Sequence, residues 1–187
     1  MLFYIKRFLG LEILVTVLLG GVGYWGMRWR GLAFVATPTP RAIAFGFLGA
    51  GFLTIWTFLV QYGYAFFKGH DYADRLTASL AKHYGHAGAA QIILGGLTAA
   101  CGEEIFFRGF LQQTLGLALA SLLFMLAHFG KRDIRVVSLW SIFQGLYLGL
   151  FFMWSHNLLV PMIAHGLFDF GGMIYFRSFM TRFEKTA

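Results

Sequence analysis

The chain has 187 residues, of which 58% are hydrophobic, 19% aromatic and only 12% charged. Soluble domains are about 45–50% apolar and about 25% charged, so this composition excludes an ordinary water-soluble globule and predicts an integral membrane protein. The formal net charge of +7 is also found in nucleic-acid-binding proteins. Here, however, the basic residues lie in short tracts between apolar runs, which fits membrane topology, and no nucleic-acid partner is predicted.

Six apolar segments are predicted to cross the lipid bilayer as helices, which makes the fold an all-α bundle of about six transmembrane helices. A helix that spans the hydrocarbon core needs about 20 residues. The segments are residues 8–27, 42–67, 87–114, 115–129, 136–155 and 157–176, and the fourth, with 15 residues, is the shortest. The first follows a basic pair, as a signal peptide would, but no small-residue cleavage site comes after it. We therefore expect a retained anchor.

The basic residues are divided unevenly between the two sides of this bundle. The side with both termini would carry eleven Lys and Arg residues, and the opposite side at most four. The positive-inside rule then places both termini in the cytoplasm, as in a bacterial-type plasma membrane protein. No repeat or low-complexity linker is visible, so residues 1–187 are predicted to form a single membrane domain.

Two sets of potential metal or redox ligands are assigned no such role. His70, His83 and His86 lie in the polar segment 68–86, where their irregular spacing favours a solvated loop over a metal site. Cys101 is the one cysteine, so no internal disulfide can form. It is predicted to be inert and to pack as a small apolar side chain.

Three charged residues, Glu103, Glu104 and Arg108, interrupt the third apolar segment within the sequence CGEEIFFRGF (101–110). A charge at the centre of the bilayer costs roughly 2.5–3.5 kcal/mol, so such residues are expected to be functional. In an α-helix, Glu104 and Arg108 lie one turn apart on one face, and we expect a bidentate ion pair. Glu103 points about 100° away, without a cation in its own helix. A desolvated carboxylate of this kind suits general-base chemistry.

Two later segments also place polar side chains one helical turn apart. SLLFMLAHF (121–129) pairs Phe124 with His128, and HGLFD (165–169) pairs His165 with Asp169. Polar groups in lipid must find one another or water. We therefore expect a polar intramembrane cavity shared by Glu103, Glu104, Arg108, His128, His165 and Asp169.

These segments resemble the motifs of the CPBP (CAAX protease and bacteriocin-processing) family of intramembrane glutamate proteases, which includes Rce1-like enzymes. EEIFFR (103–108) is similar to the family's EExxxR, FMLAH (124–128) to FxxxH, and HGLFD (165–169) to HxxxN/D. The resemblance covers about residues 88–176, which would be the catalytic core. Residues 1–87, with two spans and a polar loop, carry no matching motif.

The resemblance implies an endopeptidase that hydrolyses a peptide bond of a membrane-associated peptide or protein, without a cofactor or metal. Glu103 would activate a water molecule, His128 would hold that water, and His165 and Asp169 would line the pocket for the oxyanion. Supporting positions would be Glu104, Arg108 and Phe124. Many family members have Asn at the position of Asp169. An ionised Asp cannot donate to an oxyanion. Asp169 is therefore expected to accept a hydrogen bond from His165 and so to orient its ring, which leaves the donation to the oxyanion to the histidine.

Two other functions remain compatible with these residues. A non-catalytic membrane scaffold, for example a peptide-binding or immunity protein, would use them to hold the fold together and would show no turnover. A zinc protease would bind its metal through His128, His165 and a carboxylate, although no HExxH motif is present. A transporter is disfavoured because no pair of broken helices is visible.

The depths of two candidate residues conflict if both helices are straight and upright. Counted from the loop before it, Glu103 lies about 15 residues, or roughly 22 Å of helical rise, into the third span. His128 lies only three residues before Lys131, near the predicted cytoplasmic edge. A third span that starts deeper, a strong tilt, or a basic segment 131–135 tucked into the protein would bring the two together.

Overall fold

The computed structural model describes residues 2–68, 77–78, 81, 87–128 and 135–186. All regular elements in these residues are helices, which confirms the predicted all-α class. The segment 68–86 with its three histidines and the basic segment 131–135 fall largely outside the described residues. The elements are α1 (Leu2–Trp29), α2 (Pro40–Lys68), α4 (Ala89–Thr98), η1 (Ala99–Glu103), η2 (Ile105–Gln112), α5 (Gln113–Leu115), α6 (Leu117–Ala127), α7 (Arg135–Ser155) and α8 (Leu159–Thr186).

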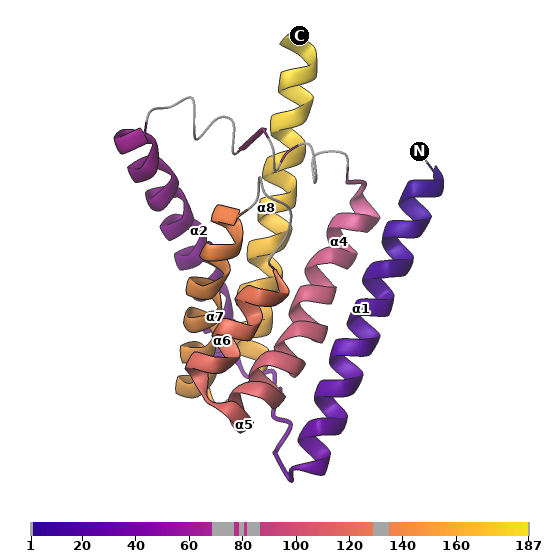
Figure 1. Cartoon of the computed structure of the whole chain (residues 1–187), viewed down its shortest axis with the longest axis vertical. Helices are drawn as coiled ribbons and strands as arrows, with labels where there is room; N and C mark the ends of the chain where they lie inside the picture. The colour runs from indigo at the N-terminus through magenta and orange to yellow at the C-terminus, as the bar shows by residue number, and fades with distance from the viewer. Residues whose placement is uncertain (1, 69–76, 79–80, 82–86, 129–134, 187) are drawn as a thin grey trace.

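The helices form an up-and-down bundle in which the chain reverses direction at each connection (Figure 1). The third pass through the bundle consists of α4, η1, η2 and α5 in sequence, and α6 returns from it. Helix α8 is central and packs against α2, α4 and α7, whereas α1 covers the outer side of η1 and η2. Both termini lie at the same end of the bundle, as the predicted topology requires (Figure 1).

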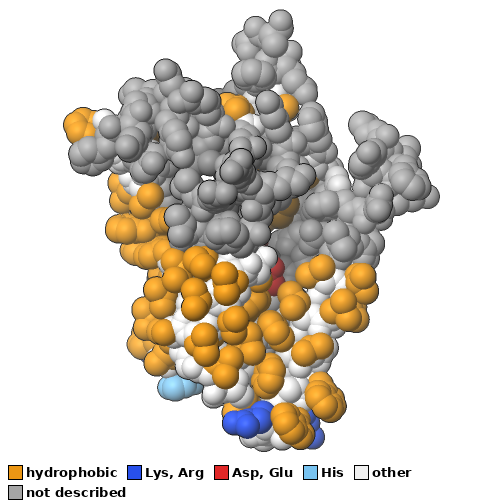
Figure 2. All heavy atoms as spheres, in the orientation of Figure 1, with side chains coloured by type: hydrophobic (Ala, Val, Ile, Leu, Met, Phe, Trp, Pro, Cys, Tyr) orange, Lys and Arg blue, Asp and Glu red, His pale blue; other side chains and the backbone are white. Residues whose placement is uncertain are grey.

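Three helical stretches in the described residues are long and apolar enough to cross a membrane: Pro40–Gly63, Ala89–Leu115 and Leu159–Thr181. The face of the bundle drawn in Figure 2 is largely apolar, with basic side chains gathered at the lower end. Helix α6 is shorter than the span predicted over 115–129, because its 11 residues rise only about 16 Å. This length is about half of the hydrocarbon core.

The third pass is not a regular α-helix where its charged residues lie. η1 and η2 are π-helical, so their hydrogen bonds join residues five apart and the turn is wider than the predicted α-helix. Residues five apart, such as Glu103 and Arg108, are thereby brought toward one side of the helix, and the two side chains interact electrostatically. The expectation that Glu103 has no cation in its own helix is therefore corrected.

A tight turn at Gly116 resolves the conflict of depth between Glu103 and His128. Gly116 joins α5 to α6 at a φ of 84°, which glycine adopts without strain. Glu103 precedes this turn by 13 residues and His128 follows it by 12. The two side chains therefore lie at similar distances from the same turn. The depths of Glu103 and His128 agree when both are counted from this helix–turn–helix connection rather than from the opposite end of the bundle.

Asparagine and threonine side chains fix the starts of α2 and α8 relative to each other. The Thr39 hydroxyl accepts a hydrogen bond from the Ala42 amide at the start of α2, and Asn157 Oδ1 accepts one from the Leu159 amide at the start of α8. Asn157 Nδ2 also donates to the carbonyl of Thr37 at 2.8 Å. These contacts join the two helix starts at the lower end of the bundle in Figure 1.

Candidate active site

A buried three-residue network forms the inner part of the site. Glu104 Oε1 accepts a hydrogen bond from Arg108 Nη1 at 2.8 Å and another from His165 Nδ1 at 2.6 Å. The side chains of Glu104, Arg108 and His165 are at most 2% exposed. The predicted pairing of Glu104 with Arg108 is confirmed, and α8 adds a histidine to it. Charge-assisted hydrogen bonds of this kind hold buried ionic groups in place.

The ion pair is not bidentate, contrary to the expectation from sequence. One oxygen of Glu104 serves both Arg108 and His165. The second guanidinium nitrogen, Arg108 Nη2, instead turns toward the carbonyl of Gly145 on α7, at 3.4 Å. Arg108 on η2 thus contacts both Glu104 in the same pass and the Gly145 carbonyl on α7.

Glu103 and His128 form the outer part of the site. Glu103 Oε2 lies 3.7 Å from His128 Nε2, and the two side chains are 19% and 35% exposed. His128 Nδ1 lies 2.8 Å from the carbonyl of Phe124. Because a carbonyl only accepts, Nδ1 carries the proton, and a neutral His128 presents the lone pair of Nε2 toward Glu103. A gap of 3.7 Å is too long for a direct hydrogen bond, and one water can bridge such a gap.

Asp169 lies at the exposed edge of the inner network. Its Oδ2 atom is 3.5 Å from His165 Nε2, and its side chain is 32% exposed while that of His165 is 2% exposed. Each ring nitrogen of His165 therefore faces a carboxylate, Glu104 on one side and Asp169 on the other. The helical spacing of HGLFD predicted the second of these contacts but not the first.

The ring of Phe124 joins the inner and outer parts. It lies 4.4 Å from the His128 ring, 5.9 Å from the His165 ring and 4.5 Å from the Arg108 guanidinium, measured between centres. A cation over an aromatic face is attracted by the ring quadrupole. Phe124 is itself fully buried and contacts both the ionic network and His128 of the outer pair.

The structure brings all six predicted polar residues together, although they come from three separate passes of the chain. On the face drawn in Figure 2, acidic surface is visible as one red patch between apolar side chains. Glu104 is fully buried, so among the site's carboxylates only Glu103 and Asp169 can be reached from outside. In the described part of the chain, no three His, Cys, Asp or Glu side chains are grouped as metal ligands.

Sequence reasoning missed the contribution of α7 to the site. Besides the contact of Arg108 with Gly145, the side-chain amide of Gln112 donates to the carbonyl of Gly149 at 2.9 Å. A side chain at Gly145 would meet the Ser121 backbone at 3.1 Å, so glycine permits α6 and α7 to approach closely. The signal was present, because 145–149 reads GLYLG and GxxxG marks close helix packing in membranes.

Cys101 differs from its prediction. Its side chain is exposed on the bundle rather than packed inside it. The residue lies in η1, two positions before Glu103.

Comparison with known proteins bears on the same part of the chain. Residues 85–171 match the model of the family described as type II CAAX prenyl endopeptidase Rce1-like. The uncharacterized protein YpbD of Bacillus subtilis (strain 168) is 42% identical over 83 residues, which are 42% of this chain and 41% of that relative. The chain thus spans about two fifths of the length of this curated relative. No solved structure matches the chain significantly.

Every residue of the site lies inside the matched segment: Glu103, Glu104, Arg108, Phe124, His128, His165 and Asp169. The match ends before the last turns of α8 and leaves out α1 and α2. The resemblance deduced from the three motifs is thereby confirmed, since residues 85–171 match the model of the type II CAAX prenyl endopeptidase Rce1-like family.

Proposed function

We propose that the protein is an intramembrane endopeptidase that hydrolyses a peptide bond of a membrane-associated peptide or protein with a water activated by Glu103. The observation that carries this proposal is the 3.7 Å approach of Glu103 Oε2 to His128 Nε2, on side chains that are 19% and 35% exposed. Both groups are acceptors when Glu103 is ionised and His128 is neutral, so a water between them donates one hydrogen to each. Its lone pair then points away from both, toward a substrate.

The hydrolysis is general-base catalysis. The water oxygen attacks the carbonyl carbon of the scissile bond while Glu103 takes a proton from the water. The carbonyl oxygen becomes the oxyanion of a tetrahedral intermediate. Collapse of that intermediate breaks the carbon–nitrogen bond, and His128 delivers a proton received from Glu103 to the leaving nitrogen. General acid–base catalysis contributes typically about 10²–10⁴-fold to a rate.

His165 is the proposed oxyanion donor, through Nε2–H. Glu104 accepts from Nδ1 and keeps the ring in one orientation, and Arg108 holds Glu104. Asp169 lies 3.5 Å from Nε2, a distance that leaves this N–H only weakly engaged before substrate binds. The role requires a proton on both ring nitrogens, for which Glu104 and Asp169 supply the acceptors. A preformed donor of this type is worth about 10²–10³ in kcat.

The test compares the protein termini generated in cells that express the wild type, Glu103→Gln or a control variant. Glu103→Gln preserves the shape of the side chain and removes the base. Leu119→Ala serves as the control, because Leu119 is 44% exposed on α6 and belongs to no part of the site. We expect new membrane-protein termini in the wild-type and Leu119→Ala cells and their loss, by at least about 10²-fold, with Glu103→Gln.

Equal thermal unfolding of the purified variants would establish that Glu103→Gln is folded. Products that persist with this variant would disprove the assignment of Glu103. Identical termini in cells with and without the wild type would favour the non-catalytic scaffold. For the zinc alternative, the metal content of the purified protein is measured before and after chelation. Loss of cleavage on chelation and its recovery with zinc would replace the proposed mechanism by metal-assisted hydrolysis.

A further inference from the structure

An open apolar groove of about 550 Å³ lies on the outside of the bundle between α2 and α7. Helix α2 lines it with residues that include Phe45 and Phe52, and α7 lines it with Tyr147, Leu150 and Trp154. None of the candidate catalytic residues contributes to it. The exposed fractions of Leu150 and Trp154 are 54% and 55%, so the groove opens to the surroundings of the bundle. In a membrane these surroundings are lipid.

The floor of the groove is held in a fixed shape. Helices α2 and α7 both pack on α8, and their backbones approach each other at few positions, which leaves the groove between them. The Tyr147 hydroxyl donates to the carbonyl of Gly49 at 3.1 Å, and the rings of Phe52 and Tyr147 stack at 5.2 Å. A side chain at Gly49 would meet the Phe151 ring at 2.8 Å, so glycine is needed for this approach. The groove is therefore preformed.

A smaller polar cavity of about 180 Å³ continues the groove at the start of α2. The two spaces share Phe45 and Trp154, and the cavity adds Arg41 and the polar side chains of Ser155 and Asn157. The guanidinium of Arg41 lies 5.4 Å from the centre of the Phe45 ring and 5.9 Å from that of the Trp154 ring. Among the described residues, no carboxylate forms an ion pair with Arg41. The cavity thus offers an uncompensated cation.

We propose that the groove and the cavity together bind one anionic phospholipid, with an acyl chain along the groove and the phosphate at Arg41. Arg41 is the second residue of the apolar stretch Pro40–Gly63, so it lies where a span ends and lipid headgroups begin. The aromatic rings can bind the apolar half of an amphipathic ligand, and the guanidinium beside them can bind its anionic half. A soluble anion would use only the cavity, and a neutral lipid only the groove. The inference is independent of the proposed peptidase activity.

The test measures phospholipid binding to the purified protein by native mass spectrometry. Phosphatidylglycerol and phosphatidylcholine with the same acyl chains are compared in the wild type, Arg41→Gln, Arg41→Lys and Arg28→Gln. Arg28 is the matched control because it is exposed, belongs to the last turn of α1, and lines neither space. One basic residue near a membrane surface changes anionic-lipid affinity about fivefold. We expect the wild type, Arg41→Lys and Arg28→Gln to prefer phosphatidylglycerol over phosphatidylcholine by about this factor. Arg41→Gln is expected to lose the preference.

A second pair of variants tests the groove. Leu150→Trp places a larger ring in the groove and is expected to weaken binding of both lipids, whereas Leu119→Trp on α6 should leave it unchanged. Equal phosphatidylglycerol binding by the wild type and Arg41→Gln would overturn the headgroup assignment. Full binding by Leu150→Trp, or complete displacement of phosphatidylglycerol by excess inorganic phosphate, would overturn the assignment of the acyl chain to the groove.

Discussion

At the scale of single residues, the inner network depends on one oxygen atom. Glu104 Oε1 accepts from Arg108 at 2.8 Å and from His165 at 2.6 Å, and all three side chains are buried. Removal of one partner from a buried ion pair typically costs about 3–5 kcal/mol, because the remaining charge stays desolvated. The network is therefore expected to be sensitive to single substitutions.

Arg108→Met is predicted to lower the free energy of unfolding by roughly 3–5 kcal/mol, since Glu104 then loses its cation. Glu104→Gln combined with Arg108→Met should cost less than the sum of the single changes, because no buried charge of the pair is left unmatched. The measurement is a double-mutant cycle of unfolding in detergent. Arg30→Met, at an exposed position, is the control and should change stability little. Additive costs would show that the pair is not coupled.

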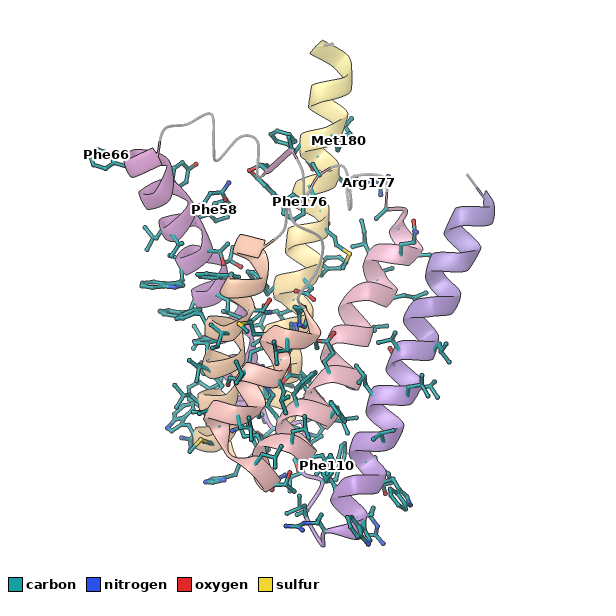
Figure 3. All side chains as sticks on the ribbon, viewed as in Figure 1. Phe58, Phe66, Phe110, Phe176, Arg177 and Met180 are labelled. Carbon is teal, nitrogen blue, oxygen red and sulfur yellow. The ribbon has the colours of Figure 1, made fainter. Side chains whose placement is uncertain are left out.

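At the scale of elements, the third pass is positioned by close packing against α1. Small residues on α1 face the backbone of the π-helical segment: a side chain at Gly23 would lie 2.7 Å from Phe106 Cα. One turn further, a side chain at Gly26 would meet the ring of Phe110, which lies near the lower end of the bundle in Figure 3. Small residues let membrane helices approach in this way. Because η1 ends with Glu103, η2 contains Arg108 and Glu104 lies between them, this contact sets the location of the site.

Gly23→Ala is predicted to destabilise the protein by about 1–3 kcal/mol, because the added methyl group forces the backbones of α1 and η2 apart. Gly21→Ala is a matched control in the same helix, since a side chain at Gly21 would meet nothing within 4 Å. Both changes alter helix propensity equally. Thermal unfolding and the cleavage assay should both distinguish the two variants. Equal behaviour of the two would mean that close α1 packing does not position the third pass.

The same elements show where sequence-based prediction ended. The spacing of Glu104 and Arg108, and that of His165 and Asp169, follows from the helical repeat and was predicted correctly. The π-helical turns were not, because they depend on how the chain packs against α1 rather than on a local pattern. The contact of Glu104 with His165 joins residues 61 positions apart, and no periodicity encodes it.

At the scale of the whole molecule, the bundle has two unlike ends. Both termini lie at one end, and the chain from α1 to α2 crosses the other (Figure 1). Figure 3 shows Phe176, Arg177 and Met180 on the part of α8 that approaches the end with the termini. Since eleven of the basic residues were assigned to that side from the sequence, we expect it to be cytoplasmic.

Cysteine labelling in intact cells tests this orientation in a Cys101→Ala background. Ala33→Cys, between α1 and α2, should react with a membrane-impermeant maleimide added outside the cells. Thr181→Cys, near the end of α8, should react only after lysis. Both positions are exposed, so accessibility to the reagent depends on the side of the membrane. The reverse pattern would show that the charge bias does not set the topology of this protein.

The sequence by itself determined the helical membrane class, the order of the passes and the identity of the polar residues. Apolar length, basic flanks and helical spacing are local properties, and the bilayer restricts buried backbone to helices. Tertiary structure alone decided the equal level of Glu103 and His128, the sharing of Glu104 Oε1, and the support from Gly145 and Gly149. These features depend on a turn at Gly116 and on contacts between distant helices, which are set by packing rather than by any local repeat.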